Sequence, residues 1–445
     1  MLGEDGVLTG SAVSERAAGI WRKDHIVAPV IFRPRNTEEV SAVLQACHAV
    51  GQPVVTHGGL TGLVEGAIAT EQDVVLSTER MTVIETVNEL DRTMQVQAGV
   101  RLQAAQDCAA ESGLMVPLDL GARGSCTLGG NAATNAGGNR VIRYGMTRDM
   151  ILGLEAVLAD GTVVSSMNAM LKNNAGYDLK QLFVGTEGTL GVITRLMLRL
   201  RPAWRSQETA LVSCDSFKQV GELLNHLDAS LGGTLSAFEL MWRDFYTLVA
   251  TTNPPLTNDS PYYVLVEALG SESAADAATF ESAIAQALDN RLINDAMVCK
   301  SGQERDALWA MRDDVEQTLE HGPAYIFDVS LRLSDMESYI NEVLAMLDEN
   351  CPGHKTWVFG HAGDGNLHIV CAAANRSGVE QSVYEPLRRV SGSVSGEHGI
   401  GLEKKSWLTV SRNDAEIRLM RQLKQALDPL GILNPGRVFD MDEVS

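Results

Sequence analysis

Three glycine-rich segments in the first half of the chain constrain its fold most strongly. They are HGGLTGLVEGA at 57–67, PLDLGARGSCTLGGNAATNAGGNRVIRYG at 117–145 and GTEGTLGVIT at 185–194. The interval 57–145 alone holds 13 glycines, more than turns usually need. Glycines this close together let backbone N–H groups converge on a pyrophosphate without a Cβ in the way, and the Ser, Thr and Asn residues between them add neutral donors. We therefore predict that the loops cradle a dinucleotide.

The loops lack the common nucleotide-binding motifs. None matches GxGxxG followed by an acidic residue, and none carries the GK[ST] of a P-loop. A Rossmann nicotinamide site or a kinase site therefore finds no support, and the dinucleotide must be held in another way.

Short strands and helices alternate around the loops. Thr37 predicts the N-cap of a helix that runs to about Val50, with a strand before it in VAPVIFRPR and another after it in PVVTHGG. Further strands are expected in DVVLST, TVIETV and TMQVQAGV, and Asp160-Gly161 predicts a hairpin turn. This pattern indicates the α+β class.

The length of 445 residues predicts two or three domains. After Pro202 the glycine loops stop, and from about 205 to 372 strands such as ETALVSC, YYVLVEAL, AYIFDVSL and KTWVFGH alternate with amphipathic helices. A last helix is expected from about Asn413 to Leu427, followed by turn residues that could carry the chain back to the first domain.

Charge and cysteine content exclude several classes of protein. With 36 basic and 57 acidic side chains the net charge is -21, which repels nucleic acid and anionic lipid. No run approaches the 18 apolar residues or so that a membrane span needs. Seven scattered cysteines without a CxxC pair argue against a disulfide framework or a thiolate metal site. We expect a cytoplasmic protein.

Histidines and a carboxylate gather in two glycine-flanked motifs, GHAGDGNLH at 360–368 and GEHGIG at 396–401. The residues GDGN between the first two histidines are typical of a turn, so a hairpin is expected to make His361 and His368 neighbours. Together with Glu397 they form a two-histidine, one-carboxylate set without sulfur, which suits Zn²⁺, Mn²⁺ or Fe²⁺ and leaves coordination positions open for substrate.

Two further residues are candidates for catalysis. His398 follows Glu397 directly and cannot easily bind the same metal, so we assign it as the general base. Arg312 lies in a predicted helix, ERDALWAMRDDVEQ, and is a candidate for binding a substrate carboxylate.

The glycine loops, GYDLKQLFVG, GHAGDGNLH, GEHGIG and LDPLGILNPG together resemble the FAD-linked oxidase family of vanillyl-alcohol-oxidase fold. Within it the chain is most similar to the D-2-hydroxy acid dehydrogenases, the group of D-lactate, glycolate and D-2-hydroxyglutarate dehydrogenases. The resemblance implies an α+β fold with a two-subdomain FAD-binding domain over 1–204, a cap domain with an antiparallel sheet and the metal site over 205–410, and a C-terminal segment over 411–445 that returns to the FAD domain.

The resemblance also implies the residues around the cofactor. The expected FAD contacts are Gly58, Gly59, Leu60, Thr61, Gly62, Pro117, Leu118, Gly121, Ser125, Gly129, Gly130, Thr134, Asn135, Gly138, Glu187, Gly188, Ile193 and Asn434. His57 is not in the arrangement associated with a covalent flavin, so we expect FAD to be dissociable.

The implied reaction is oxidation of a D-2-hydroxy acid to the 2-oxo acid. A divalent metal, Zn or Mn, chelates the substrate, His398 takes the hydroxyl proton, and the C2 hydride passes to flavin N5. The electron acceptor is expected to be electron-transfer flavoprotein, a quinone or a cytochrome, and a homodimer is conceivable.

The chain departs from the resembling D-2-hydroxyglutarate enzymes at three positions. Ile326, Val370 and Glu316 stand where those enzymes tend to have Lys, Asn and Thr. Arg332 could replace the lost cation if the strand in AYIFDVSLR is regular. Two other functions stay open: a non-redox FAD-dependent transferase resembling alkyl-glycerone-phosphate synthases, and a non-enzymatic flavin- or metal-binding protein.

Overall fold

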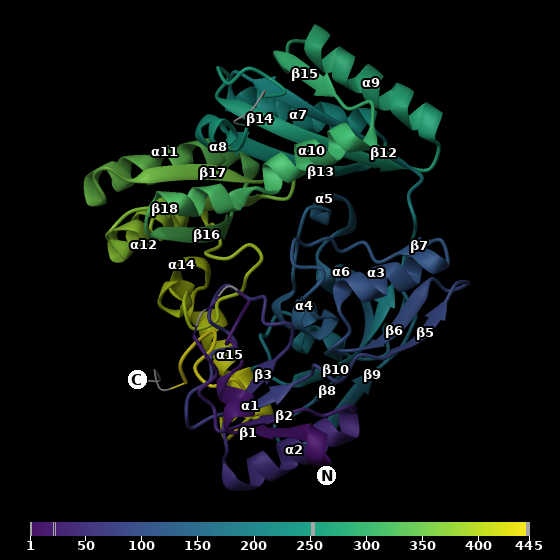
Figure 1. Ribbon diagram of the computed structural model, residues 1–445, viewed down its shortest axis with the longest axis vertical. Coiled ribbons are helices and arrows are strands. Elements are labelled where there is room, and N and C mark those ends of the chain that lie inside the picture. The colour runs from purple at the N-terminus through teal and green to yellow at the C-terminus, as the bar shows by residue number, and fades with distance from the viewer. Residues whose placement is uncertain (1, 21, 23, 251–253, 442–445) are drawn as a thin grey trace. The chain divides into compact units, whose positions relative to one another are not determined.

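The computed structural model describes residues 2–20, 22, 24–250 and 254–441, and the chain divides into two compact units (Figure 1). The first unit contains residues 1–138, 145–203 and 397–445, and the second contains residues 139–144 and 204–396. The functional division of the chain into residues 1–204, 205–410 and 411–445 remains a prediction. The compact units differ from that division in placing 139–144 with the second unit and 397–410 with the first.

The first unit is built on two main sheets. Its strands are β1 (Val7–Thr9), β2 (Val30–Phe32), β3 (Val54–His57), β4 (Val74–Ser77), β5 (Ile84–Asn88), β6 (Thr93–Gln97), β7 (Leu114–Met115), β8 (Ile151–Val157), β9 (Val163–Ser166), β10 (Val192–Arg199) and β11 (Arg201–Pro202). The four-stranded sheet has the order β1-β2-β4-β3, with β2, β4 and β3 parallel. The five-stranded sheet has the order β5-β6-β10-β8-β9 and is antiparallel. The β8–β9 pair turns at Asp160-Gly161, which confirms the predicted hairpin.

The first unit also contains helices between and after these strands. They are α1 (Ser11–Ser14), α2 (Thr37–Val50), α3 (Leu102–Glu111), α4 (Leu128–Thr134), α6 (Thr147–Met150), α14 (Leu408–Ser411) and α15 (Asp414–Leu427). The predicted N-cap of α2 was wrong by one position, because the Asn36 side chain accepts from the Glu39 N–H. The Thr37 hydroxyl instead donates to the buried carboxylate of Glu155 at 2.7 Å. The predicted end of α2 at Val50 and the last helix are confirmed.

The second unit contains one seven-stranded antiparallel sheet. Its strands are β12 (Ser206–Cys214), β13 (Leu235–Trp242), β14 (Tyr262–Gly270), β15 (Asp295–Val298), β16 (Ala324–Ser330), β17 (Lys355–His361) and β18 (Asn366–Ala372). The order is β15-β12-β14-β13-β17-β18-β16. Strand β13 was not predicted from the sequence, whereas β12, β14, β16 and β17 were.

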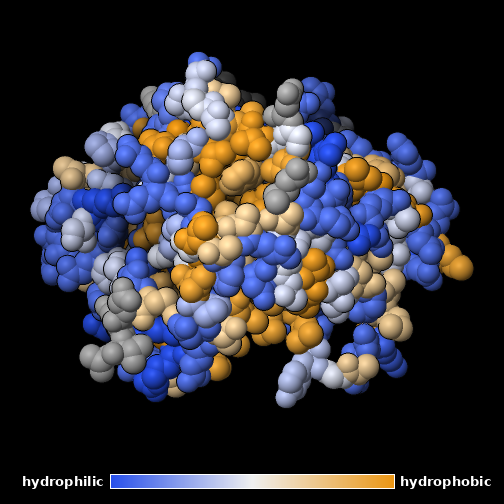
Figure 2. Space-filling model, turned by 90° about the horizontal axis from the view of Figure 1, so that it is seen from below, coloured by the Kyte–Doolittle hydropathy of each residue, from blue (hydrophilic) through white to orange (hydrophobic). Residues whose placement is uncertain are grey.

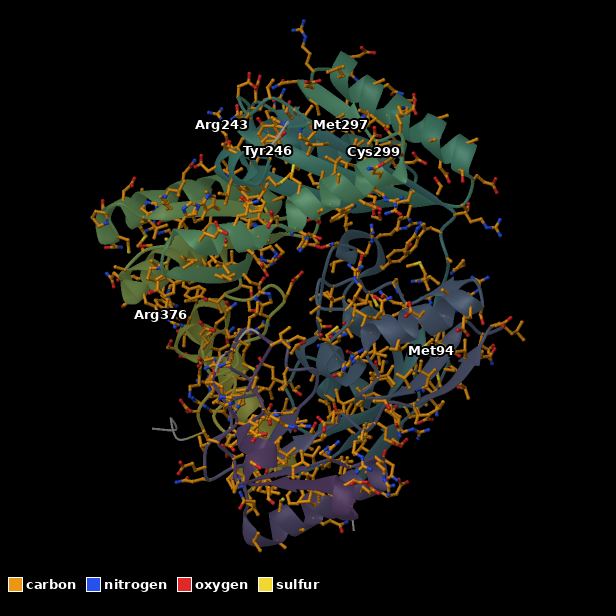
Figure 3. All side chains as sticks on the ribbon, viewed as in Figure 1. Met94, Arg243, Tyr246, Met297, Cys299 and Arg376 are labelled. Carbon is orange, nitrogen blue, oxygen red and sulfur yellow. The ribbon has the colours of Figure 1, made fainter. Side chains whose placement is uncertain are left out.

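Helices pack on this sheet (Figure 1). They are α5 (Val141–Tyr144), α7 (Phe217–Ser230), α8 (Arg243–Val249), α9 (Ser273–Asp289), α10 (Gly302–Asp313), α11 (Leu333–Asn350), α12 (Arg376–Tyr384) and α13 (Leu387–Val390), with a 3-10 segment η3 (Val315–His321). Tyr246 of α8, labelled in Figure 3, stacks on Tyr263 of β14 with ring centroids 3.7 Å apart. Leu308 of α10 joins the same apolar core, so α8 and α10 cover one face of the sheet.

Two buried carboxylates on that face, those of Glu267 and Glu239, form ion pairs with arginines. Glu267 of β14 pairs with Arg140 from the short segment 139–144 and accepts from Trp309 Nε1 at 2.9 Å. Glu239 of β13 pairs with Arg312 of α10. A charge buried in this way needs such a partner, because burial removes its hydration. These pairs explain why the face tolerates acidic residues.

The outer surface drawn in Figure 2 mixes hydrophilic residues with smaller apolar areas. No helix within the described part of the chain combines the length and the apolar character that crossing a bilayer requires.

Candidate active site

A cavity of about 460 Å³ in the first unit is lined by all three glycine loops. Most of the predicted FAD contacts line it: Gly58, Gly59, Leu60, Thr61, Gly62, Gly121, Gly129, Gly130, Thr134, Glu187, Gly188, Ile193 and Asn434. Glu397 and His398 line it as well, so the GEHGIG segment shares the cavity with the three glycine loops. The cavity has the size of a small-molecule site.

Glycine is required where the first two loops pack on each other. A Cβ on Gly59 would lie 2.3 Å from the Ser125 carbonyl oxygen, and a Cβ on Gly58 would lie 2.7 Å from Thr127 Oγ1. A Cβ on Gly62, in contrast, would meet nothing within 4 Å, although Gly62 lines the cavity. Some glycines therefore let the loops approach each other, and others leave space open for a ligand.

The remaining predicted FAD contacts do not line the cavity; they are Pro117, Leu118, Ser125, Asn135 and Gly138. Pro117 and Leu118 are buried. Asn135 ends α4 in the left-handed conformation, and its Oδ1 accepts from the Arg148 N–H at 2.9 Å. Gly138 passes so close to the Asp119 carbonyl that a Cβ would lie 2.0 Å from that oxygen. Asn135 and Gly138 therefore contact other parts of the protein backbone instead of lining the cavity.

Glu187 holds the GEHGIG segment in the first unit. Its carboxylate accepts from the backbone N–H groups of Ile400 at 2.7 Å and Gly401 at 2.8 Å. Burial raises the pKa of Glu187, and the two N–H donors oppose that rise. A Cβ on Gly401 would lie 1.9 Å from the Val64 carbonyl oxygen, so the segment also packs directly on the first glycine loop. Glu397 and His398 are presented to the cavity from this anchored segment.

The C-terminal residues return to β3. Asn434 Oδ1 accepts from the Thr56 N–H at 2.8 Å, and Asn434 Nδ2 donates to the Glu187 carbonyl at 2.6 Å. The buried Lys424 of α15 donates to the carbonyl oxygens of Thr189 and Leu433, each at 2.8 Å. The last helix is thereby fastened to the third glycine loop.

His57 ends β3 next to the first glycine loop but is not among the cavity-lining residues. Its Nε2 lies 2.8 Å from the Ala67 carbonyl oxygen, and the ring is almost fully buried. Burial lowers the pKa of His57 from 6.5 to about 4, because the imidazolium form loses its hydration.

This burial predicts a pH dependence of stability. As the pH falls from above 6.5 towards 4, the unfolded chain gains a proton on His57 that the folded chain does not, so stability decreases in that window. Between pH 7.5 and 4.5 the wild type should lose about 2–3 kcal/mol more free energy of unfolding than His57→Gln, which has no titrating ring. Urea titrations of both proteins at the two pH values measure the difference. Equal losses would show that the ring is not buried in its neutral form.

In the second unit the hairpin β17–β18 brings His361 and His368 together, as predicted. Gly365 takes the left-handed conformation in the turn, and the Asp364 N–H donates to the His361 carbonyl at 3.1 Å. The two imidazole rings lie 5.2 Å apart between centroids and nearly perpendicular to each other. Phe359, opposite His368 in the register, packs on the His368 ring.

Glu239 lies between the predicted Arg312 and the predicted His361. Its Oε1 is 2.7 Å from His361 Nδ1, and its Oε2 is 2.7 Å from Arg312 Nη2. Although burial alone would raise it, the adjoining His361 and Arg312 hold the pKa of Glu239 well below its usual range. Sequence reasoning missed Glu239; the signal available was one acidic residue inside the apolar run LSAFELMW.

Asp328 fixes the chain just before Glu397. The Asn366 side chain donates to Asp328 Oδ1 at 2.6 Å, and Ser395 Oγ donates to Asp328 Oδ2 at 3.2 Å. A Cβ on Gly396 would collide with the Asn366 side chain. The segment that leads to Glu397 therefore lies against the first residue of β18, two positions before His368 on the same strand.

Arg332 is not on strand β16, contrary to the expectation for a regular strand. The strand ends at Ser330, and Arg332 is the N-terminal flanking residue of α11. Its side chain is 74% exposed and donates to Asp335 at 2.8 Å. Because the strand ends before Arg332, strand alternation does not place Arg332 beside Asp328.

Two protein-family models match the chain. The model for the C-terminal domain of FAD linked oxidases matches residues 204–438, and an FAD binding domain model matches residues 28–166. The chain belongs to the FAD-linked oxidase family. It is a FAD-dependent oxidoreductase, which confirms the resemblance seen in its motifs.

Curated relatives align over most of the chain. A mitochondrial D-2-hydroxyglutarate dehydrogenase of Bos taurus is 41% identical over 420 residues, which cover 92% of this chain and 76% of the relative. A D-2-hydroxyglutarate dehydrogenase of Xanthomonas citri pv. viticola is 38% identical over 424 residues, covering 92% and 89%. A provisionally named mitochondrial D-lactate dehydrogenase of Schizosaccharomyces pombe is 38% identical over 422 residues, covering 91% and 80%.

Solved structures share the fold at low sequence identity. A p-cresol methylhydroxylase with substrate bound has a TM-score of 0.77 at 16% identity and covers 100% of this chain and 96% of that one. An alkyldihydroxyacetonephosphate synthase has a TM-score of 0.75 at 16% identity, covering 97% and 82%. These matches confirm the predicted α+β fold of vanillyl-alcohol-oxidase type.

Proposed function

We propose that this protein oxidises a D-2-hydroxy acid of the D-lactate or D-2-hydroxyglutarate type to the 2-oxo acid in a metal-dependent reaction. The observation that carries the proposal is the pair of imidazoles on the β17–β18 hairpin, His361 and His368, in a chain whose relatives include proteins named D-2-hydroxyglutarate dehydrogenase and D-lactate dehydrogenase. Two imidazoles are typical ligands of a divalent metal with positions left for substrate.

We propose Glu397 as the third metal ligand. The backbone of Gly396 lies against the Asn366 side chain in the second unit. Glu397 is the next residue, and consecutive Cα atoms are only about 3.8 Å apart, so Glu397 is kept near Asn366. A set of two imidazoles and one carboxylate without sulfur fits Zn²⁺ or Mn²⁺. When bound, such a metal supplies a Lewis acid that lowers the pKa of a coordinated hydroxyl.

The other residues are assigned by their chemistry. His398 takes the proton of the substrate 2-hydroxyl on a ring nitrogen, because it is the imidazole that lines the cofactor cavity. The predicted FAD contacts that line this cavity would hold the cofactor without a covalent bond. FAD, when bound, supplies the acceptor for the C2 hydride at its N5. Arg312 is proposed to orient a substrate carboxylate, in addition to its ion pair with Glu239.

The substrate's far end is the least defined part of the proposal. Ile326 and Val370 face each other across β16 and β18, two register positions from the pair Asp328 and His368. These two positions are therefore apolar, and the exposed Arg332 does not supply a cation there. Both D-lactate and D-2-hydroxyglutarate are accordingly included in the test.

We further propose electron-transfer flavoprotein, a quinone or a cytochrome as the electron acceptor, because the chain lacks a nicotinamide-binding fingerprint. A cytoplasmic location and a homodimer remain proposals of the same kind.

The experiment mixes the purified, metal-replete protein anaerobically with D- and L-2-hydroxy acids and follows absorbance at about 450 nm, where oxidised flavins absorb. We expect one D-acid to bleach the flavin rapidly, its L-enantiomer to have no effect, and a chelator to abolish bleaching until Zn²⁺ or Mn²⁺ is restored. Bleaching that survives complete metal removal would contradict the metal-dependent mechanism. Failure of every acid to bleach the metal-replete protein would favour a non-redox function.

A further inference from the structure

We infer that Glu239 is a positioning residue that keeps the His361 proton on Nδ1 and thereby presents Nε2 to the metal. This inference rests on the metal site of the proposed function. It goes further in assigning a role to a buried carboxylate outside the predicted ligand set.

Glu239 and His361 are direct cross-strand neighbours. They face each other in the register of β13 and β17, so both side chains project from the same face of the sheet. The distance from Glu239 Oε1 to His361 Nδ1 is 2.7 Å, and both side chains are buried. Strand pairing therefore fixes the contact independently of any loop.

Arg312 fixes the orientation of the Glu239 carboxylate. Its Nε and Nη2 approach the same oxygen, Oε2, at 2.9 and 2.7 Å. A guanidinium has only donors, so it always requires an acceptor at this point. Oε1 is then directed at the imidazole, and it too is an acceptor. Arg312 therefore contacts one oxygen of the Glu239 carboxylate, and the other oxygen contacts the His361 imidazole.

The consequence for His361 follows from the chemistry of imidazole. A neutral ring has one N–H and one lone pair, and the N–H is placed on the nitrogen that faces the acceptor. With Nδ1 donating to Glu239, the lone pair is on Nε2. Carboxylates that hold a ligand histidine in this way typically contribute about 10–100-fold to metal affinity.

Glu239→Gln tests this logic because the arginine dictates how the new amide turns. Arg312 requires the amide oxygen, so the amide nitrogen would face His361 Nδ1 and donate to it. The imidazole proton must then move to Nε2, which removes the lone pair from the metal side. In Glu239→Gln/Arg312→Met the amide is released from this constraint and can offer its oxygen to Nδ1 again.

A matched control lies on the next strand. Glu267 is an equally buried carboxylate on the same face of the sheet and is also paired with an arginine, Arg140. Its carboxylate accepts from the side chains of Trp309, Gln207 and Thr209, none of which is a proposed metal ligand. Glu267→Gln therefore reports the cost of neutralising a buried acid in this sheet without touching His361.

The experiment measures Zn²⁺ affinity of the metal-stripped, FAD-containing proteins by competition with a chromogenic chelator, without substrate. We expect Glu239→Gln to bind Zn²⁺ about 10–100-fold more weakly, Glu267→Gln to bind it as the wild type does, and Glu239→Gln/Arg312→Met to regain affinity. Equal affinity of Glu239→Gln and the wild type would overturn the inference while leaving the metal site intact. A wild type that binds no Zn²⁺ would overturn the metal site itself and the inference with it.

A second measurement needs no variant. In the wild-type protein labelled with ¹⁵N-histidine and freed of metal, the neutral His361 ring should carry its proton on Nδ1, which the ¹⁵N chemical shifts of the two ring nitrogens distinguish. A proton on Nε2 would overturn the inference even if Glu239→Gln fails to fold.

Discussion

Replacing His398 with glutamine should slow substrate-driven flavin reduction by about 10²–10⁴-fold, the usual contribution of a positioned general base. The side chain lines the cofactor cavity, and Glu187 anchors the segment that carries it. Glutamine fills similar space but cannot take the hydroxyl proton. Stopped-flow bleaching of the flavin by the preferred D-acid, with the bound FAD quantified beforehand, measures the effect.

The pH profile gives this prediction a second readout. The rise in rate with pH that a base imposes should be present in the wild type and absent in His398→Gln. His226→Gln is the control, because His226 is in α7 and its Nε2 lies 2.8 Å from the Ala283 carbonyl, away from the proposed ligands. A wild-type rate in His398→Gln would reject the assignment of His398 as base.

Locally encoded features of the site could be predicted from the sequence. The turn residues between His361 and His368 act within a few positions, so the hairpin followed from short-range rules alone. The same holds for the Asp160-Gly161 turn. Even the error at the start of α2 was local, since Asn36 and Thr37 are both good caps and only the structure shows which one is used.

Features that depend on strand pairing could not be predicted. Glu239 is separated from His361 by 122 positions, and their contact exists only because β13 pairs with β17. Strand β13 itself was missed, since the run LSAFELMW is apolar on both faces apart from Ser236 and this glutamate and lacks a clear period of two. The prediction that Arg332 lies on the strand was wrong for a related reason, because the start of α11 decides whether the strand continues past Ser330.

The glycine loops have some features that could be predicted from the sequence and others that depend on distant contacts. Their glycine content indicated a backbone that needs open space, and several of these residues do line the cavity. The sequence could not show what a Cβ would meet at each one. At Gly59 it would meet the backbone of the second loop, whereas at Gly124 it would meet nothing within 4 Å.

The lack of space for a Cβ at Gly59 predicts that Gly59→Ala has a large effect on cofactor binding. A Cβ on Gly59 would lie 2.3 Å from the Ser125 carbonyl oxygen and 2.8 Å from Cys126 Cα, both backbone atoms that cannot rotate away. Gly59→Ala must therefore push the first two glycine loops apart and deform the cavity that both line. We expect Gly59→Ala to bind FAD at least about tenfold more weakly than the wild type and to be purified with less FAD, since a cost of about 1.4 kcal/mol already weakens binding tenfold and overpacking costs typically 1–3 kcal/mol.

Gly124→Ala supplies the matched control, because it adds the same methyl group to the second loop at a position with open space and no left-handed backbone. It should retain FAD in full. The flavin content of both variants is measured by absorbance after release from denatured protein, and their folding by the midpoint of urea unfolding without FAD. If Gly59→Ala kept its FAD, the close contact of the two loops would not be what shapes the cofactor site; if it lost FAD but unfolded at the wild-type midpoint, the strain would be confined to the cavity.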